Sequence, residues 1–437
     1  MISAIGLIAG LGLLILLTMR GVHIIIAATV SAALVAITSG VAMMPPFADA
    51  DAPDYVTAYM RGFTGFFADW FFMFLLGAIF GEVMSASGAA DSAAKFIIER
   101  LGVRYAVLAV VAACAALTYG GVSVFIVAFS VYPMAVSLFR DANLPHRFIP
   151  AALCFGSVTF TMTSAGSPEI QNLIPIEFLG TTAMAGWRVS AVVAVLLAIT
   201  GYIWLQRMVG RAVANGETFE GALGEHVERD EGPLPHPILS LVPLIIVLAA
   251  FNLTDDMLGK YALVLALGLG TLAALAIGWR HRMQMPKAFG VGATGAVIAI
   301  TNTCAVVGFG TVAQLTPAFQ QALGVVTAIP GDPLIGAAIA VTVICGLTGS
   351  ASGGQTIALP LIAPGYIDAG VEPGELHRVA ALASGALDSL PHNGYVVTTI
   401  RAICGETHAR AYGPVGALTV ILPLVGLVLA VGLFIIF

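Results

Sequence analysis

The sequence GLTGSASGG, residues 346–354, interrupts a long apolar segment that runs over 334–365. Seven of its nine residues are glycine, serine or alanine. Glycine permits a sharp reversal of the chain. Inside a membrane, irregular backbone is tolerated only where it faces protein or a polar cavity, because its N–H and C=O groups need partners. We therefore interpret 334–365 as a re-entrant helical hairpin with this stretch at its tip.

The composition indicates a polytopic membrane protein. Of 437 residues, 59% are hydrophobic and 10% are charged, whereas soluble domains average about 25% charged. A second long segment, 105–139, is also interrupted at its centre, by TYGGVS (118–123), and we interpret it as a second hairpin. The expected fold is all-α, with ten crossings and two hairpins. The apolar segments are 2–19, 22–40, 67–86, 105–139, 147–178, 187–206, 238–253, 260–279, 288–310, 334–365, 377–402 and 413–437.

The distribution of Lys and Arg predicts the orientation. When Arg20 is placed in the cytoplasm, the predicted crossings leave four of the 18 basic residues on the opposite side. Cytoplasmic loops of membrane proteins carry such an excess. We therefore expect a multi-pass protein of the bacterial inner membrane with both termini in the periplasm. The four residues on the periplasmic side are Arg61, Arg188, Lys260 and Arg378.

The two halves of the chain resemble each other at a nearly constant offset. Pro133–Arg147 resembles Pro364–Arg378 at an offset of 231 (364 − 133 and 378 − 147), and Gly81 matches Gly310 at 229 (310 − 81). Each half contains five crossings, an odd number, so the second half is expected to be inverted, as in many secondary transporters. The predicted N-terminal repeat covers 1–206, with its hairpin at about 105–139 and a broken helix over 147–178. A cytoplasmic linker is predicted over 207–237. The predicted C-terminal inverted repeat covers 238–437, with its hairpin at about 334–365 and a broken helix over 377–402.

Four polar interruptions supply the candidate substrate-binding residues. Two are the hairpin tips, and two are breaks in the helices that follow, TFTMTSAGSPEIQN (159–172) and GALDSLPHNGYVVTT (385–399). Their hydroxyls and the N–H groups of helix N-termini can hold a small carboxylate without Lys or Arg. Close packing of helices by small residues is the alternative role of the tips. The candidate residues are Thr118, Gly120, Gly121, Ser123, Thr163, Ser164, Gly166, Ser167, Thr348, Gly349, Ser350, Ser352, Gly353, Ser389, His392 and Asn393.

Asp388 and His392 are the first candidates for proton coupling. They are four residues apart, so a continuous helix would place both on one face. An acid inside a membrane marks a functional site by default, and burial favours its neutral, protonated form. A structural Asp–His pair is the alternative. Glu169 is the next candidate for coupling, whereas His146 and His377 are expected at the membrane edges.

Three stretches carry a resemblance to a known family: GEVMSASGAADSAAKFI (81–97), the two hairpin tips, and ALDSLPHNGYVVTTIRAICGETHARAYGPVG (386–416). Over essentially its whole length the chain resembles the gluconate permease (Gnt) family of the ion-transporter superfamily, and 386–416 is most similar to D-β-hydroxybutyrate permeases. The family implies uptake of a small hydroxy-monocarboxylate, with D-3-hydroxybutyrate favoured, by proton symport. The superfamily implies a scaffold and a transport domain, an elevator movement and a homodimer. Sodium-coupled relatives carry Ser-Asn-Thr at both tips, and the tips here contain no Asn, which favours protons.

The sequence leaves several alternative functions open. The near alternatives are a permease for gluconate or another sugar acid and a sodium-coupled carboxylate transporter. An intramembrane hydrolase could use Ser350 or Ser352 with His392 and Asp388, but GSASG has Ala where G-x-S-x-G has its nucleophile. A channel would need rotational symmetry, which an inverted repeat does not supply. We therefore expect no catalytic residues, no cofactor, no metal and no nucleic-acid partner; the expected partners are an organic anion, protons, the lipid bilayer and a second copy of the chain.

Overall fold

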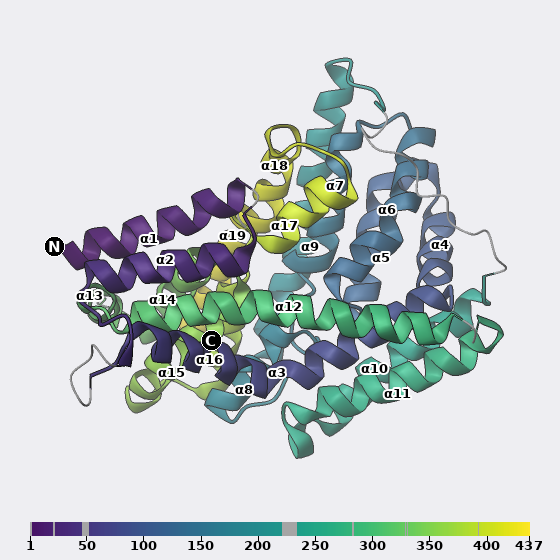
Figure 1. Cartoon of the computed structure of the whole chain (residues 1–437). Coiled ribbons are helices and arrows are strands. Elements are labelled where there is room, and N and C mark those ends of the chain that lie inside the picture. The colour runs from purple at the N-terminus through teal and green to yellow at the C-terminus, as the bar shows by residue number, and fades with distance from the viewer. Residues whose placement is uncertain are drawn as a thin grey trace.

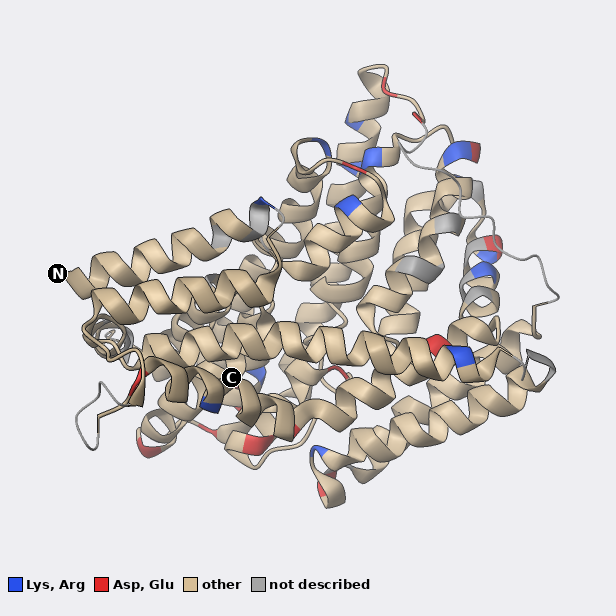
Figure 2. Ribbon diagram, in the orientation of Figure 1, with Lys and Arg blue, Asp and Glu red and all other residues tan. Residues whose placement is uncertain are grey.

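The computed structural model describes residues 2–20, 22–45, 52–220, 234–281, 284–327, 329, 331–391 and 393–437. Over these residues the chain consists of helices and connecting turns, with no strand (Figure 1), so the expected all-α class is confirmed. Most helices carry long uncharged stretches, and Lys and Arg gather toward the upper and right-hand side of Figure 2. Among the described residues, five helical stretches are long and apolar enough to cross a membrane: Tyr55–Ala86, Trp187–Ala214, Pro237–Thr254, Met285–Gln314 and His408–Ile436.

The helices follow the same order in the two halves of the chain. Each half has two apolar helices, a long helix, a short amphipathic helix, two helices joined by a tight turn, an interrupted helix and a last apolar helix. The first half contains α1 (Ile2–Met19), α2 (Ile24–Thr38), α3 (Tyr55–Ala86), α4 (Ala89–Leu101), α5 (Ala106–Tyr119), α6 (Val124–Asp141), α7 (Ile149–Cys154), α8 (Ile174–Leu179) and α9 (Trp187–Ala214). The second contains α10 (Pro237–Leu258), α11 (Tyr261–Ile277), α12 (Met285–Gln314), α13 (Pro317–Thr327), α14 (Pro333–Thr348), α15 (Ala351–Asp368), α16 (Pro373–Ser384), α17 (Gly394–Val397), α18 (His408–Gly416) and α19 (Leu422–Ile436).

The two halves interlock. The long helices α3 and α12 lie side by side across the front of the molecule and run in opposite directions (Figure 1). They approach closely: a methyl group at Gly292 of α12 would lie 2.9 Å from the Cα atom of Ile79 in α3. Small residues permit such contacts between membrane helices. At one end α1 packs on α13, and at the other α10 packs on α4, so each half contributes to both ends.

Two tight reversals separate α5 from α6 and α14 from α15. Gly121 (φ +88°) permits the first and Gly349 (φ +61°) the second, since both have the left-handed backbone that favours glycine. Ser350 then caps α15, because its Oγ atom accepts a hydrogen bond from the N–H of Gly353 at 3.2 Å. The second turn thus lies at 349–350, and Ser352 and Gly353 belong to the first turn of α15.

The helix after each hairpin is interrupted by irregular backbone. α7 continues as a π-helical turn to Thr159, and residues 160–169 are not helical. α16 ends at Ser384, and the described residues of 385–393 are not helical. Each irregular segment contains a proline, which has no N–H for a helical hydrogen bond and clashes with the preceding turn. Below, these are called the first and second irregular segments.

Several boundaries differ from those expected. α3 begins at Tyr55, well before the predicted segment 67–86, because the Oδ1 atom of Asp54 accepts a hydrogen bond from the N–H of Thr57 at 3.0 Å and caps the helix. α9 continues through 207–214, which were expected to belong to the linker; part of that linker, 221–233, lies outside the described residues. The amphipathic helices α4 and α13 were not predicted, since they are too short and too polar to register as crossings.

Candidate functional site

A cavity of about 330 Å³ lies where the two hairpin turns meet the two irregular segments. Its volume is at the lower end of the range for ligand sites, about 300–1,000 Å³. All four of the predicted polar interruptions contribute to its lining. The cavity is therefore the candidate substrate site, of a size suited to a small molecule. The predicted residues that line it are Gly121, Ser123, Glu169, Thr348, Gly349, Ser350, Ser352, Asp388, Ser389 and Asn393.

Asn393 joins the second irregular segment to the second hairpin turn. Its Oδ1 atom accepts a hydrogen bond from the N–H of Val396 at 2.9 Å and so caps α17. Its Nδ2 atom donates to the backbone carbonyl of Gly349 at 3.2 Å. One amide thereby sets the spacing between two segments that face the cavity.

Asp388 lies in a turn of the second irregular segment and is 5% exposed. Its Oδ1 atom accepts a hydrogen bond from the hydroxyl of Ser389 at 3.0 Å. The continuous helix that would have placed Asp388 and His392 on one face is not formed, because α16 ends at Ser384 and residues 385–391 are not helical. His392 itself lies outside the described residues.

Glu169 brings a second carboxyl group to the cavity, from the other half of the chain. It is half-buried, and within the described residues its carboxylate forms no hydrogen bond or ion pair. Among the described lining residues Glu169 and Asp388 are the charged ones, with no Lys or Arg. The site therefore combines two acids with hydroxyl, amide and backbone groups.

The remaining predicted residues contact the protein rather than the cavity. The hydroxyl of Ser164 donates to the carbonyl of Phe160 at 2.6 Å, and the hydroxyl of Ser167 accepts from the N–H of Glu169 at 3.4 Å. Thr118 is fully buried. The residues in this group are Thr118, Gly120, Thr163, Ser164, Gly166, Ser167 and Gly353.

A buried arginine holds the first irregular segment in place. Arg378 is 0% exposed and donates hydrogen bonds to the carbonyls of Thr163 at 2.7 Å, Ala183 at 3.0 Å and Ala185 at 2.9 Å. Outside a helix these carbonyls need other partners. Arg378 comes from α16, in the opposite half of the chain, so its side chain fastens the two halves together beside the site.

Two histidines expected at the membrane edges are buried inside the protein. The Nε2 atom of His377 lies 3.2 Å from the Oδ1 atom of Asn172, and the Nδ1 atom of His146 lies 2.8 Å from the Oε1 atom of Glu406. Each contact joins the two halves. Their burial could not be predicted, because the partners are distant in sequence and nothing local indicates them.

The sequence comparison decides the family. Residues 2–267, more than half of the chain, match the profile of the GntP family permease. The chain belongs to the GntP permease family. This permease is also 33% identical over 458 aligned positions to the uncharacterized transporter YxjC of Bacillus subtilis (strain 168), with 95% of both chains covered.

The permease has a fold similar to that of the YdaH transporter of Alcanivorax borkumensis, known from a crystal structure. The TM-score is 0.57, the match covers 100% of this chain and 99% of the other, and the sequence identity is 14%, so the similarity concerns the fold alone. Together with the apolar helices, the family supports a multi-pass membrane protein that acts as a transporter.

Part of the cavity wall of the permease was not predicted from the sequence. The long helix α3 contributes Met73 and Phe74, and α12 contributes Asn302 and Thr303. A signal was present, because Thr-Asn-Thr (301–303) is a polar triplet within the apolar segment predicted over 288–310. Polar residues inside a crossing are expected to face protein or a cavity.

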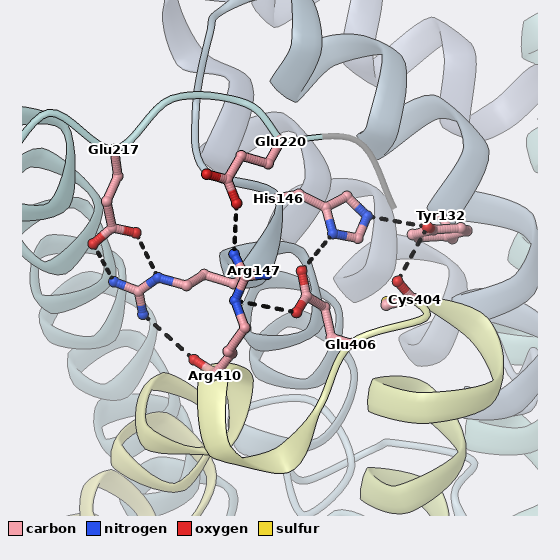
Figure 3. A network of polar contacts seen from close by, with 8 residues as sticks. All are labelled: Tyr132, His146, Arg147, Glu217, Glu220, Cys404, Glu406 and Arg410. Atoms are coloured by element: carbon pink, nitrogen blue, oxygen red, sulfur yellow. Dashed lines mark hydrogen bonds and ion pairs between the residues drawn. The ribbon is translucent and has the colours of Figure 1, made fainter. Parts of the chain in front are cut away.

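The permease also has a second polar cluster, around His146 (Figure 3). The Nε and Nη2 atoms of Arg147 donate to the two carboxylate oxygens of Glu217 at 2.7 and 2.8 Å, and the Nη2 atom of Arg410 donates to Glu220 at 3.0 Å. The hydrogen bonds from Arg147 hold the pKa of Glu217 below its usual value. The segment after α9 thus pairs with one arginine from each half, and the cluster joins the halves rather than offering unpaired charge to a substrate.

Proposed function

We propose that this permease is a secondary active transporter that imports a small hydroxy-monocarboxylate together with protons, with D-3-hydroxybutyrate as the favoured substrate. The observation that carries the proposal is the charge of the cavity. Its described lining contains the acids Asp388 and Glu169 and no Lys or Arg. Such a site can hold an anion only if its own acids do not remain fully ionised.

Proton coupling follows from this arrangement. A bound carboxylate beside an ionised Asp388 would place two negative charges together in a poorly solvated site, and like charges favour protonation of one partner. Binding of the anion therefore recruits a proton, and release of the anion returns it. With the proton bound, the site and the substrate together carry one negative charge fewer than they would with Asp388 ionised. This lowers the free energy of moving the loaded site through a low-dielectric membrane.

The carboxylate of the substrate is proposed to lie at the start of α15. This helix is capped by Ser350, and Ser352 lies in its first turn. The N–H groups of a helix N-terminus and the helix dipole favour an anion, and the hydroxyls of Ser350 and Ser352 supply further donors. A cradle without a fixed cation keeps the affinity modest, which assists release.

The wall formed by α3 supports a short acid with an alkyl end. Met73 and Phe74 line the cavity together with Val124 and Phe125 of α6. A polyhydroxylated acid such as gluconate would bury hydroxyls against these side chains without partners, which is unfavourable. The small volume and the apolar wall therefore favour a hydroxybutyrate-like substrate over a sugar acid.

We further propose that 1–206 and 238–437 are inverted repeats. Equivalent contacts support this. A methyl group at Gly81 would overlap the Cδ1 atom of Ile126, and one at Gly310 would overlap the Cδ1 atom of Ile357. The offset between these isoleucines is 231 (357 − 126), close to the offset of 229 between the glycines. The two halves thus form the same long-helix-to-hairpin contact.

The proposed transport cycle is an elevator movement. The hairpins and the interrupted helices pack on one another, as α14 and α15 do on α16, and are proposed to form the transport domain. The helices α3 and α12 pack along each other and are proposed to belong to the scaffold. The protein is proposed to function as a homodimer in the bacterial inner membrane, with both termini periplasmic. The positive-inside distribution of Lys and Arg supports this orientation.

The test is a substrate panel in proteoliposomes under imposed gradients. D-3-hydroxybutyrate should accumulate when the interior is alkaline and should not respond to an inward sodium gradient at constant pH. Accumulation driven by sodium alone would favour the sodium-coupled alternative, since carboxylate oxygens are also cation ligands. Accumulation of gluconate with no transport of D-3-hydroxybutyrate would reject the proposed substrate.

A further inference from the structure

The helices α3 and α12 present different chemistry to the cavity at corresponding positions. Gly81 of α3 matches Gly310 of α12 at an offset of 229 residues. At the same offset, Met73 corresponds to Asn302 (302 − 73 = 229) and Phe74 corresponds to Thr303 (303 − 74 = 229). All four residues line the cavity. One half of the chain therefore offers an apolar pair where the other offers an amide and a hydroxyl.

The amide of Asn302 has no partner within the described residues. Its Oδ1 atom is buried and accepts no hydrogen bond from the described residues. Asn302 is also not among the described residues that have further polar contacts. An unpaired amide in a poorly solvated site is unfavourable. It can be satisfied by a ligand that enters the cavity.

Thr303 differs from the threonine two positions earlier on the same helix. Its hydroxyl donates to the carbonyl of Ala299 at 3.2 Å and can still accept a hydrogen bond from the cavity. Thr301 makes the same type of contact, with the carbonyl of Val297 at 2.6 Å, but does not line the cavity. Thr301 is therefore a matched control for Thr303.

We propose that Asn302, assisted by Thr303, binds the hydroxyl group of the substrate, and that Met73 and Phe74 hold its alkyl part. This inference rests on the proposed function and adds the residues that select the substrate. An alcohol both donates and accepts hydrogen bonds, and so does a side-chain amide. With the carboxylate at the start of α15, these contacts orient a substrate that has three chemically distinct groups: carboxylate, hydroxyl and alkyl. Because α3 and α12 belong to the proposed scaffold, the contacts with the hydroxyl and the alkyl part act when the substrate binds and are released when the transport domain moves.

Selectivity follows from both walls. A site that hydrogen-bonds a substrate hydroxyl discriminates against the analogue that lacks it, because the buried polar group of the site is then left unpaired. The apolar pair discriminates in the other direction, against additional hydroxyl groups. The permease should therefore prefer an acid with one hydroxyl to the same acid with none and to acids with several.

The experiment compares D-3-hydroxybutyrate, butyrate and D-gluconate as substrates of the full-length protein in proteoliposomes. The variants are Asn302→Leu and Thr303→Val, with Thr301→Val as the control. For the wild type, KM for D-3-hydroxybutyrate should be about tenfold lower than for butyrate, the effect of one well-placed hydrogen bond. Asn302→Leu should remove this preference: KM for the hydroxy acid should rise about tenfold because its hydroxyl loses its partner, and KM for butyrate should not rise, because butyrate no longer leaves an amide unpaired. Thr303→Val should reduce the preference in part, and Thr301→Val should not change it.

The outcomes separate this inference from the proposed function. A wild type that transports both acids with equal KM, or an Asn302→Leu variant that preserves the preference, would overturn the inference and leave carboxylate transport intact. A wild type that transports none of the three acids would reject the proposed function, and the inference with it. If Asn302→Leu does not fold, as judged by gel filtration in detergent, the comparison of Thr303→Val with Thr301→Val tests the proposal instead. The proposal would be contradicted if the ratio of KM for butyrate to KM for D-3-hydroxybutyrate were the same in these two variants.

Discussion

The side-chain amide of Asn393 donates a hydrogen bond to the backbone carbonyl of Gly349 at 3.2 Å, and so ties the start of α17 to the turn between α14 and α15. The same side chain caps α17 through the N–H of Val396. A residue that both caps a helix and fixes a hairpin turn can be tested by separating its two roles.

Asn393→Ser should retain the cap, since serine is nearly as good as asparagine at that position, but it loses the amide donor to Gly349. We expect an increase of about tenfold in KM, which corresponds to about 1.4 kcal/mol, with a thermal unfolding temperature close to that of the wild type. Asn393→Ala should lose both roles and unfold at a lower temperature as well. Unchanged uptake kinetics in both variants would show that this contact does not shape the site.

Gly354 lies where the two arms of the second hairpin touch. A methyl group there would lie 2.5 Å from the Cα atom of Cys345, and backbone cannot move aside as a side-chain end can. We expect Gly354→Ala to destabilise the protein by about 1–3 kcal/mol. Gly365→Ala, in the same helix with open space around it, is the control and should be neutral or slightly stabilising. Equal unfolding temperatures for the two variants would contradict the packing described.

Arg378 donates three hydrogen bonds to backbone carbonyls, one in the first irregular segment (Thr163) and two in the loop between α8 and α9 (Ala183 and Ala185). Arg378→Met leaves those buried carbonyls without their donor, at about 1–3 kcal/mol for each unsatisfied group. We expect a large fall in the unfolding temperature or loss of folded protein. Arg188→Met, at an exposed arginine in α9, should behave like the wild type. A stable Arg378→Met variant with normal transport would show that the segment is held by other contacts.

Glu217 and Arg147 form an ion pair in which their side chains are 38% and 22% exposed, respectively. The pair therefore contributes only about 0–1 kcal/mol to the free energy of unfolding. Because Arg147 lowers the pKa of Glu217, this contribution is complete above the unfolded-state pKa of glutamate, about 4.3, and is lost as the pH falls through the lower folded-state value. Wild type should unfold at a slightly higher temperature than Glu217→Gln at pH 7, and the difference should shrink below about pH 4.3. Glu99→Gln, in the more exposed Lys95–Glu99 pair, should unfold at the same temperature as the wild type at both pH values. A difference in unfolding temperature between wild type and Glu217→Gln that does not vary with pH would contradict the pairing.

Local chemistry explains what could be predicted from the sequence. The all-α membrane class follows from composition and the length of the apolar segments. Glycine at 121 and 349 indicates where the chain can reverse. Proline at 168 and 391 indicates a stretch that cannot be helical, although the preceding helices already end nine and seven residues earlier, at Thr159 and Ser384. The polar residues at those interruptions could therefore be named as site candidates before any tertiary contact was known.

Tertiary contacts explain what could not be predicted. The burial of Arg378 could not be predicted, because one of the carbonyls to which it donates a hydrogen bond, that of Ala185, lies 193 residues earlier in the chain (378 − 185). The helical spacing of Asp388 and His392 failed because irregular backbone replaces the helix there. Asn302 could not be predicted in this way, because glycine and proline mark interruptions of a helix, whereas Asn302 lies within the uninterrupted helix α12.

The central claim is that Asp388 couples substrate uptake to protons, and Asp388→Asn in proteoliposomes tests it most directly. The asparagine resembles the protonated acid in shape and charge, so the variant should bind D-3-hydroxybutyrate and exchange it across the membrane at rates near those of the wild type, yet fail to concentrate it under a pH gradient. Glu169→Gln, at the other acid of the cavity, is the matched comparison and should still concentrate the substrate. If Asp388→Asn accumulates D-3-hydroxybutyrate against its gradient as the wild type does, Asp388 does not carry the proton and the account is contradicted.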